Sequence, residues 1–345
     1  MPWFDPSRPT LLPGLGLTVA IAILAYALQQ VEVRLLRYAL IEAIVIAMLL
    51  GIVWRNLMGV HPRLEPGITF TAKPVLELAI VLLGASVNLP QLMAAGTNLL
   101  LAIVLVVSIG IGTSLLIGRS LGLNLNLALL VAVGNAICGN SAIAALAPVI
   151  GANKEDVASS IALTAVLGVV VVLGLPLLIP AIELSSYQYG VLAGMTVYAV
   201  PQVLATTFPV SALSTEVGTL VKLVRVLLLG PIVLVCSLLV RAQRATTKRI
   251  GLGRLVPWFI TGFLLMSTIR SLGLLPGDLA ESLRALSRWL TIAAMAALGL
   301  GVDIRSLRRV GLPVGITVLA SLTVLIVVSL MLILGLNIGA PAVNS

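Results

Sequence analysis

Charge is what this sequence has little of. Charged residues make up only 10% of its 345 residues, against roughly 25% in ordinary soluble domains. Hydrophobic residues make up 60%, and the mean hydropathy is +1.18. A water-soluble protein of this length needs far more charge to cover its surface, so the composition excludes a soluble enzyme and predicts a multi-pass membrane protein.

Histidine, cysteine and aromatic residues are also scarce. The single histidine, His61, cannot build a histidine-based metal site, and two cysteines do not make a disulfide framework. The sequence has neither a glycine-rich phosphate loop nor a Gly-x-Ser-x-Gly nucleophile motif, so we expect no enzyme activity, no cofactor and no metal. With only 4% aromatic residues, the net charge of +9 fits basic cytoplasmic loops better than a nucleic-acid surface.

The apolar segments predict an all-α polytopic membrane protein with ten or eleven transmembrane helices. A helix needs about 20 residues to cross about 30 Å of hydrocarbon, and the alternation of outer-membrane strands is absent. Most Lys and Arg fall on one side of the bilayer if the N-terminus lies inside, which predicts N-in and C-out in a cell (inner or plasma) membrane. Residues 1–345 then form one transmembrane domain whose surroundings are the lipid bilayer. The predicted spans are 12–30, 38–55, 74–89, 98–118, 126–148, 158–181, 188–208, 217–240, 254–272, 287–303 and 311–336.

Two stretches of the chain resemble each other. LLGASVNLPQLMAAG, at 82–96, aligns without a gap with ALGLGVDIRSLRRVG, at 297–311. The copies lie an odd number of predicted spans apart and would run in opposite directions, the inverted repeat of many transporters. The halves would cover about 12–155 and 188–336. A chance match between Leu- and Gly-rich segments, and a five-plus-five division of the spans, are the open alternatives.

The segment AVGNAICGNSAIAALAPVI, residues 132–150, places small and polar residues inside a predicted span. Glycine at 139 can adopt backbone conformations that other residues avoid, and the two residues after it can cap a new helix. We therefore predict a helix broken near 138–140, with a half-helix from about residue 141 whose positive end attracts anions. A tight helix–helix contact is the alternative. The candidate substrate-binding residues here are Asn135, Cys138, Gly139, Asn140 and Ser141.

Lys222 and Arg225 lie inside the predicted span 217–240. They are three positions apart and therefore share a helix face. Charge inside a span is costly and marks a candidate functional site, and the fork of an arginine suits a tetrahedral oxyanion. The alternative is a helix that starts later, so that both side chains reach the headgroups.

Two further places offer polar groups inside predicted spans. Pro201 should bend the helix over 188–208, and Tyr198 and Gln202 share one face of it as candidate substrate-binding residues. A structurally satisfied kink is the alternative. Glu42, in the second predicted span, is the candidate for proton coupling, because a carboxyl group inside a membrane can act as a proton relay.

The run ICGNSAIAALAPVI, the helix with Lys222 and Arg225, and the late stretch AALGLGVDIRSL resemble the YeiH-type family of integral membrane proteins, often labelled as sulfate exporters. The likeness extends roughly from the second predicted span to the end of the chain. It implies a fold related to sodium–proton antiporters and bile-acid symporters, with inverted repeats and two broken helices that cross near the midplane. It further implies that residues 138–141 lie at this crossing and that the two cations face it.

The resemblance has one departure. The family often has a histidine and an acidic residue where this chain has Tyr198 and Ala199, which argues against proton coupling through this segment. Homodimers are common among related folds, so a second copy of the chain is a candidate partner.

Together these observations predict a secondary-active transporter, an exporter or exchanger, for a small anion such as sulfate or a related oxyanion. It would work by alternating access between two repeats, with a proton or a sodium ion as coupling ion. The alternative from the same fold group is a cation–proton antiporter that uses Glu42 or Asp303. Nothing in the sequence separates a carrier from a channel.

Overall fold

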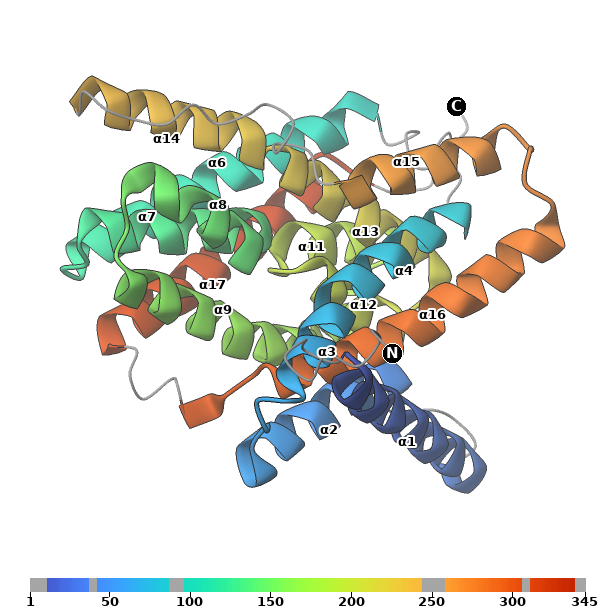
Figure 1. Ribbon diagram of the computed structural model, residues 1–345. Coiled ribbons are helices and arrows are strands. Elements are labelled where there is room, and N and C mark those ends of the chain that lie inside the picture. The colour runs from blue at the N-terminus through green and yellow to red at the C-terminus, as the bar shows by residue number, and fades with distance from the viewer. Residues whose placement is uncertain (1–10, 37–41, 87–95, 244–257, 306–310, 339–345) are drawn as a thin grey trace, which may run out of the picture. The chain divides into compact units, whose positions relative to one another are not determined.

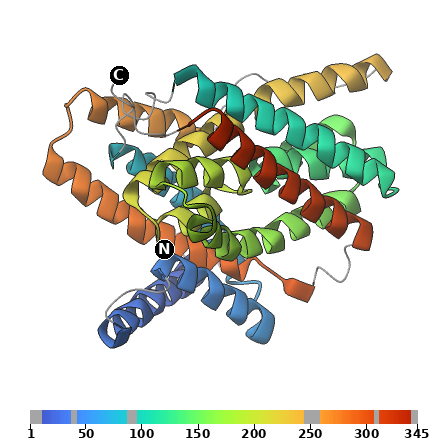
Figure 2. The ribbon, with the colours of Figure 1, turned by 180° about the vertical axis from the view of Figure 1, so that it is seen from behind.

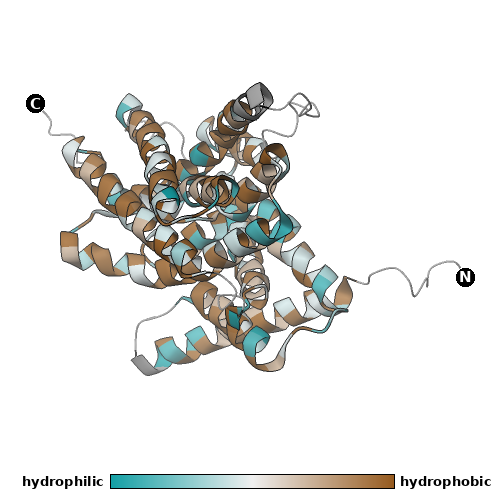
Figure 3. Ribbon diagram, turned by 90° about the vertical axis from the view of Figure 1, so that its left-hand side faces the viewer, coloured by the Kyte–Doolittle hydropathy of each residue, from teal (hydrophilic) through white to brown (hydrophobic). Residues whose placement is uncertain are grey.

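The protein is described by a computed structural model over residues 11–36, 42–86, 96–243, 258–305 and 311–338. Within these ranges the chain is helical and contains no β-strand. Seven helical runs in them are long and apolar enough to cross a membrane, and hydrophobic positions follow most of the ribbon (Figure 3). The prediction of an all-α polytopic membrane protein is confirmed.

Each of the eleven predicted segments contains helix, although the helix ends differ. The helix α16 (Gly277–Leu300) begins ten residues before the predicted 287. Its first turns carry Asp278, Glu281 and Arg284, which lower the hydropathy without stopping the helix. Three further apolar helices are shorter than a full span, so the number of crossings stays a prediction.

The chain packs as two compact units that both use distant parts of the sequence. Unit 1 contains residues 1–88 and 261–304, and unit 2 contains 89–260 and 305–345. Each unit therefore takes residues from both predicted repeat halves. The inverted repeat, the halves and the N-in orientation stay predictions.

In unit 1, α2 packs closely on α16 (Figure 1). A Cβ on Gly299 would lie 2.2 Å from the carbonyl oxygen of Met48, and one on Gly51 would lie 2.4 Å from that of Ala296. Glycine thus lets the two backbones touch. The elements of unit 1 are α1 (Leu12–Leu36), α2 (Ala43–Met58), α3 (Glu65–Phe70), η1 (Thr71–Val75), α4 (Leu76–Leu83), η2 (Gly84–Ser86), most of α15 (Trp258–Ser271), and α16.

Unit 2 holds the segment 132–150 and the helix with Lys222 and Arg225. In it α17 packs against α6, as the view from behind shows (Figure 2), and α11 packs against α13, where a Cβ on Gly194 would lie 2.7 Å from the Gly218 carbonyl oxygen. Its elements are α6 (Gly96–Ser120), α7 (Leu125–Val133), η3 (Gly134–Cys138), α8 (Asn140–Ile150), α9 (Lys154–Gly174), η4 (Leu175–Leu177), α10 (Leu178–Ile182), α11 (Ser186–Thr196), α12 (Val200–Thr207), α13 (Ala212–Leu227), α14 (Leu229–Gln243) and α17 (Leu312–Gly335).

The helix predicted to break near 138–140 does break there. The helix α7 continues as the π-helical turn η3, and α8 begins two residues after η3 ends. Between them Gly139 has φ 61° and ψ −122°, a conformation that L side chains rarely adopt. This glycine ends one half-helix and allows the next to start.

A second interruption lies where the sequence predicted only a bend. The helix α11 ends at Thr196, Val197 and Ala199 are extended with ψ 144° and 148°, and α12 begins at Val200. Pro201 lies in the first turn of α12, where its missing N–H has no helical acceptor to lose. The expectation of one bent helix was therefore wrong, because the chain separates into two helices before the proline.

Candidate functional site

The two interruptions lie against each other in unit 2. A Cβ on Gly139 would lie 3.6 Å from the Cβ of Tyr198, an ordinary van der Waals contact. We call this place the double break and define it as residues 134–139 and 197–199. Two helical segments, η3 and α11, end there, and two, α8 and α12, begin there. Unpaired backbone groups from four helix ends are therefore collected at one place.

Lys222 projects from α13 into the double break and is fully buried. Its Nζ donates hydrogen bonds to the carbonyl oxygen of Ile137 and, at 2.7 Å, to that of Val197. The first carbonyl belongs to η3 and the second follows α11. One side chain thus joins the two interruptions.

Arg225 lies one turn further along α13 and is also fully buried. Nε and Nη2 donate to the carbonyl oxygen of Ala136 at 3.1 and 2.6 Å, and Nη2 also donates to that of Asn135 at 3.3 Å. Nη1 donates to the carbonyl oxygens of Gly194 and Val197 at 2.7 and 3.2 Å. A guanidinium has five N–H donors, so each has a backbone acceptor. The guanidinium of Arg225 therefore faces backbone carbonyls. The sequence led us to expect that it would face a bidentate oxyanion.

The double break brings two basic side chains to two negative helix ends. Its carbonyls are the unpaired acceptors at the ends of η3 and α11, where each helix dipole leaves about −0.5 charge. Buried cations cost several kcal/mol unless they are well bonded, and these carbonyls supply the bonds. Within the described chain Lys222 and Arg225 hydrogen-bond only to backbone carbonyls, and none of their partners is a carboxylate. The positive charge of the two side chains therefore exceeds the partial negative charge at the C-terminal ends of η3 and α11.

The N-terminal end of α8 is open beside these cations. Asn140 and Ser141 are exposed, although the residues just before them are buried. The expectation that one of them caps the helix was wrong, since the N-cap position is Gly139. Asn140 is already helical, and its Oδ1 instead accepts a hydrogen bond from Thr164 Oγ1 at 3.0 Å. The Ala142 N–H donates to the Gly139 carbonyl oxygen at 3.1 Å, whereas the N–H groups of Asn140 and Ser141 have no backbone acceptor among the described residues. Free N–H groups at a helix N-terminus are the usual setting for an anion.

The segment after the second interruption is held by Gln202. Its Oε1 accepts a hydrogen bond from the Ala199 N–H at 3.2 Å. Gly168 of α9 makes room for this side chain, because a Cβ there would lie 2.0 Å from Gln202 Nε2. Gln202 thus braces the start of α12. Tyr198 is buried, and its hydroxyl has no hydrogen-bond partner in the part of the chain that the structure describes.

Asn135 and Cys138 complete the predicted site residues at the double break. Asn135 Nδ2 donates to Ser321 Oγ of α17 at 2.6 Å, while its Oδ1 has no partner among the described residues. Cys138 is buried with a free thiol. The sequence did not single out Ser321, Thr164 or Gly168, because one small polar residue or glycine in an apolar span is too common a signal. Over the described ranges no group of three His, Cys, Asp or Glu residues could hold a metal ion.

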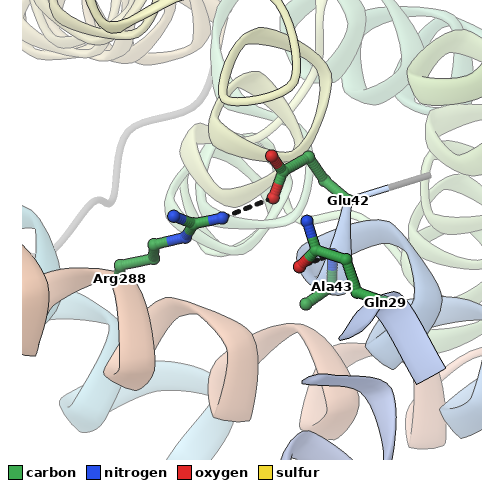
Figure 4. A network of polar contacts seen from close by, with 4 residues as sticks. All are labelled: Gln29, Glu42, Ala43 and Arg288. Atoms are coloured by element: carbon green, nitrogen blue, oxygen red, sulfur yellow. Dashed lines mark hydrogen bonds and ion pairs between the residues drawn. The ribbon is translucent and has the colours of Figure 1, made fainter. Parts of the chain in front are cut away.

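Glu42 belongs to unit 1 and lies outside the double break. The sequence placed it inside a span, but α2 begins at Ala43, and Glu42 is the extended residue before it. Its Oε2 accepts a hydrogen bond from Arg288 Nη2 at 2.7 Å as an ion pair, next to Gln29, whose Oε1 accepts from the Ala43 N–H (Figure 4). The Arg288 side chain of this ion pair is 43% exposed. The proton-coupling role of Glu42 stays a prediction.

These features define a polytopic membrane protein with a cationic site at two interrupted helices. The chain belongs to the family described as conserved hypothetical protein 698, whose model matches residues 13–335. This is the YeiH-type family that the sequence resembled.

The relatives are named as membrane proteins. The chain is 54% identical to a UPF0324 membrane protein of Brucella melitensis, over 94% of this chain and 90% of that protein. It is 48% identical to one of Bradyrhizobium diazoefficiens (95% and 92%) and 33% identical to one of Bacillus cereus (86% and 84%). No solved structure shows a significant match.

Proposed function

We propose that this protein is a secondary-active transporter, an exporter or exchanger, that carries a small anion such as sulfate or a related oxyanion by alternating access. One observation carries the proposal. Lys222 and Arg225 are fully buried and bonded to backbone carbonyls of residues 135–137, the segment that precedes the N-terminus of α8.

Some residues of the site would contact the anion, and the others would act on it through charge or hold the site in shape. The anion would bind at the first N–H groups and side chains of Asn140 and Ser141, because these are exposed and a helix N-terminus attracts anions. The two cations would raise the positive potential of this place without touching the anion, since their donors face carbonyls. The buried Asn135, Cys138, Gly139 and Tyr198 would shape its floor, and Gln202 would hold the second interruption.

Currents from purified protein in proteoliposomes on a solid-supported membrane test the proposal. Jumps of sulfate, sulfite and small carboxylates are applied, and tracer counterflow of [35S]sulfate is followed in parallel, because electroneutral exchange gives no current. A saturable response to one of these anions supports the proposal. No anion response in either measurement contradicts it.

The same preparation tests the cation–proton antiporter alternative. Sodium and potassium jumps at constant anion would then give a pH-dependent response, and Glu42→Gln would abolish it. Gel filtration with light scattering tests the predicted homodimer, and membrane fractionation tests the predicted cell-membrane location.

A further inference from the structure

We propose that this protein needs no sodium ion for transport, because Lys222 and Arg225 occupy the backbone carbonyls that would otherwise bind a coupling cation. The transport part of this inference rests on the proposed function. The binding part rests on the carbonyl contacts alone.

Carbonyl oxygens at interrupted helices are where transporters bind coupling cations. In such folds the unwound backbone and the C-terminal ends of half-helices coordinate sodium ions or protons. In this chain the corresponding carbonyls are those of η3 and of the residues that end α11. Five of these carbonyls accept hydrogen bonds from the two side chains: Asn135, Ala136, Ile137, Gly194 and Val197. The Gly134 carbonyl accepts from the Gly139 N–H instead.

The contacts also have the pattern of a shared cation position. The carbonyl oxygen of Val197 accepts from Lys222 Nζ at 2.7 Å and from Arg225 Nη1 at 3.2 Å, so both cations meet at one acceptor. Each cation takes acceptors from both interruptions. A free cation beside the Val197 carbonyl would likewise hold the two negative helix ends together.

A covalently attached cation has different consequences from a bound ion. It is present at every stage of the cycle, so the helix ends stay joined when no ion gradient exists. Arg225 also keeps its positive charge, because a guanidinium stays protonated in proteins. Anion binding therefore requires no second ion at these carbonyls, and a sodium gradient has no site at them through which to drive transport.

The first test compares wild-type protein with and without sodium. Counterflow of [35S]sulfate is measured in sodium gluconate and in N-methyl-D-glucamine gluconate at one pH, and the melting temperature of the purified protein is measured in both salts. We expect counterflow rates equal within about twofold and the same melting temperature. A flux that falls tenfold without sodium, or a wild-type melting temperature that rises with sodium, would overturn the inference.

The second test vacates the cation position. In Lys222→Ala the Ile137 carbonyl loses its donor and the Val197 carbonyl keeps only the longer bond from Arg225 Nη1. Ammonium or methylammonium should therefore raise the melting temperature and recover part of the lost flux. Lys154→Ala is the matched control, since Lys154 is exposed at the start of α9 and its removal should create no such response. An equal response of both variants to ammonium contradicts the inference.

The outcomes separate this inference from the proposed function. If the wild type moves none of the tested anions in either salt, the proposed function fails, while the melting temperatures still decide whether the carbonyls are occupied. If Lys222→Ala does not fold, Lys222→Gln replaces it, and the wild-type comparison stands without either variant.

Discussion

Replacing Asn140 with aspartate should weaken anion binding without weakening the fold. Asn140 is exposed at the first position of α8, and its Oδ1 accepts from Thr164 Oγ1 at 3.0 Å, a bond that a carboxylate keeps. A negative charge in the first turn stabilises a helix by about 0.3–1 kcal/mol. A carboxylate about 5 Å from a singly charged anion repels it by about 1 kcal/mol in water and about 3 kcal/mol at an effective dielectric constant of 20, and it repels a dianion such as sulfate about twice as strongly. We therefore expect roughly 5- to 150-fold weaker binding of a singly charged anion, and a larger loss for sulfate.

The assay is the concentration dependence of sulfate counterflow, with the melting temperature measured on the same preparation. For Asn140→Asp the half-saturating concentration should rise, and the melting temperature should stay equal or increase. Asn153→Asp is the matched control, because Asn153 is an exposed N-cap whose Oδ1 accepts from the Asp156 N–H at 2.7 Å. Equal half-saturation in wild type and Asn140→Asp would refute the assignment of the anion to the N-terminus of α8.

Three further variants test the packing around the site. Arg225→Lys replaces five donors by at most three, so the stability should fall on the order of 2–4 kcal/mol; an unchanged melting temperature would contradict the role of the carbonyl bonds. Gly168→Ala should destabilise by about 1 kcal/mol, because its Cβ would meet the terminal amide of Gln202 at 2.0 Å and turn that side chain away from the Ala199 N–H. Gly174→Ala in the same helix meets nothing within 4 Å and should melt like the wild type. Glu42→Gln removes a partly exposed ion pair and should cost at most about 1 kcal/mol with sulfate flux retained; loss of a proton-driven flux would instead identify Glu42 as the coupling group.

The fold class followed from composition because the bilayer restricts what a chain can do. With 10% charged residues, long apolar segments must lie in lipid, and backbone groups in lipid must pair within helices. The interruption at Gly139 was also predictable, since glycine followed by Asn140 and Ser141 is a local signal. Lys222 and Arg225 stood out because charge inside an apolar segment is rare.

The second interruption and the end of α2 had weaker local signals. Pro201 predicts a disturbed helix but does not say whether the chain bends or separates, since proline fits equally in a kink and in a first turn. Glu42 looked buried because apolar residues follow it, yet it precedes α2 and pairs with Arg288. Its partner lies far along the chain, where no sequence spacing could point to it.

Composition and local motifs were enough to predict a helical membrane protein, the place where one helix breaks, and the two cations inside a span. What these cations bind became visible in the fold. Their partners are backbone carbonyls, and every residue carries the same carbonyl, so no residue type marks which ones are left unpaired. That depends on where two separate helices end and on how they pack against α13, which the fold alone specifies.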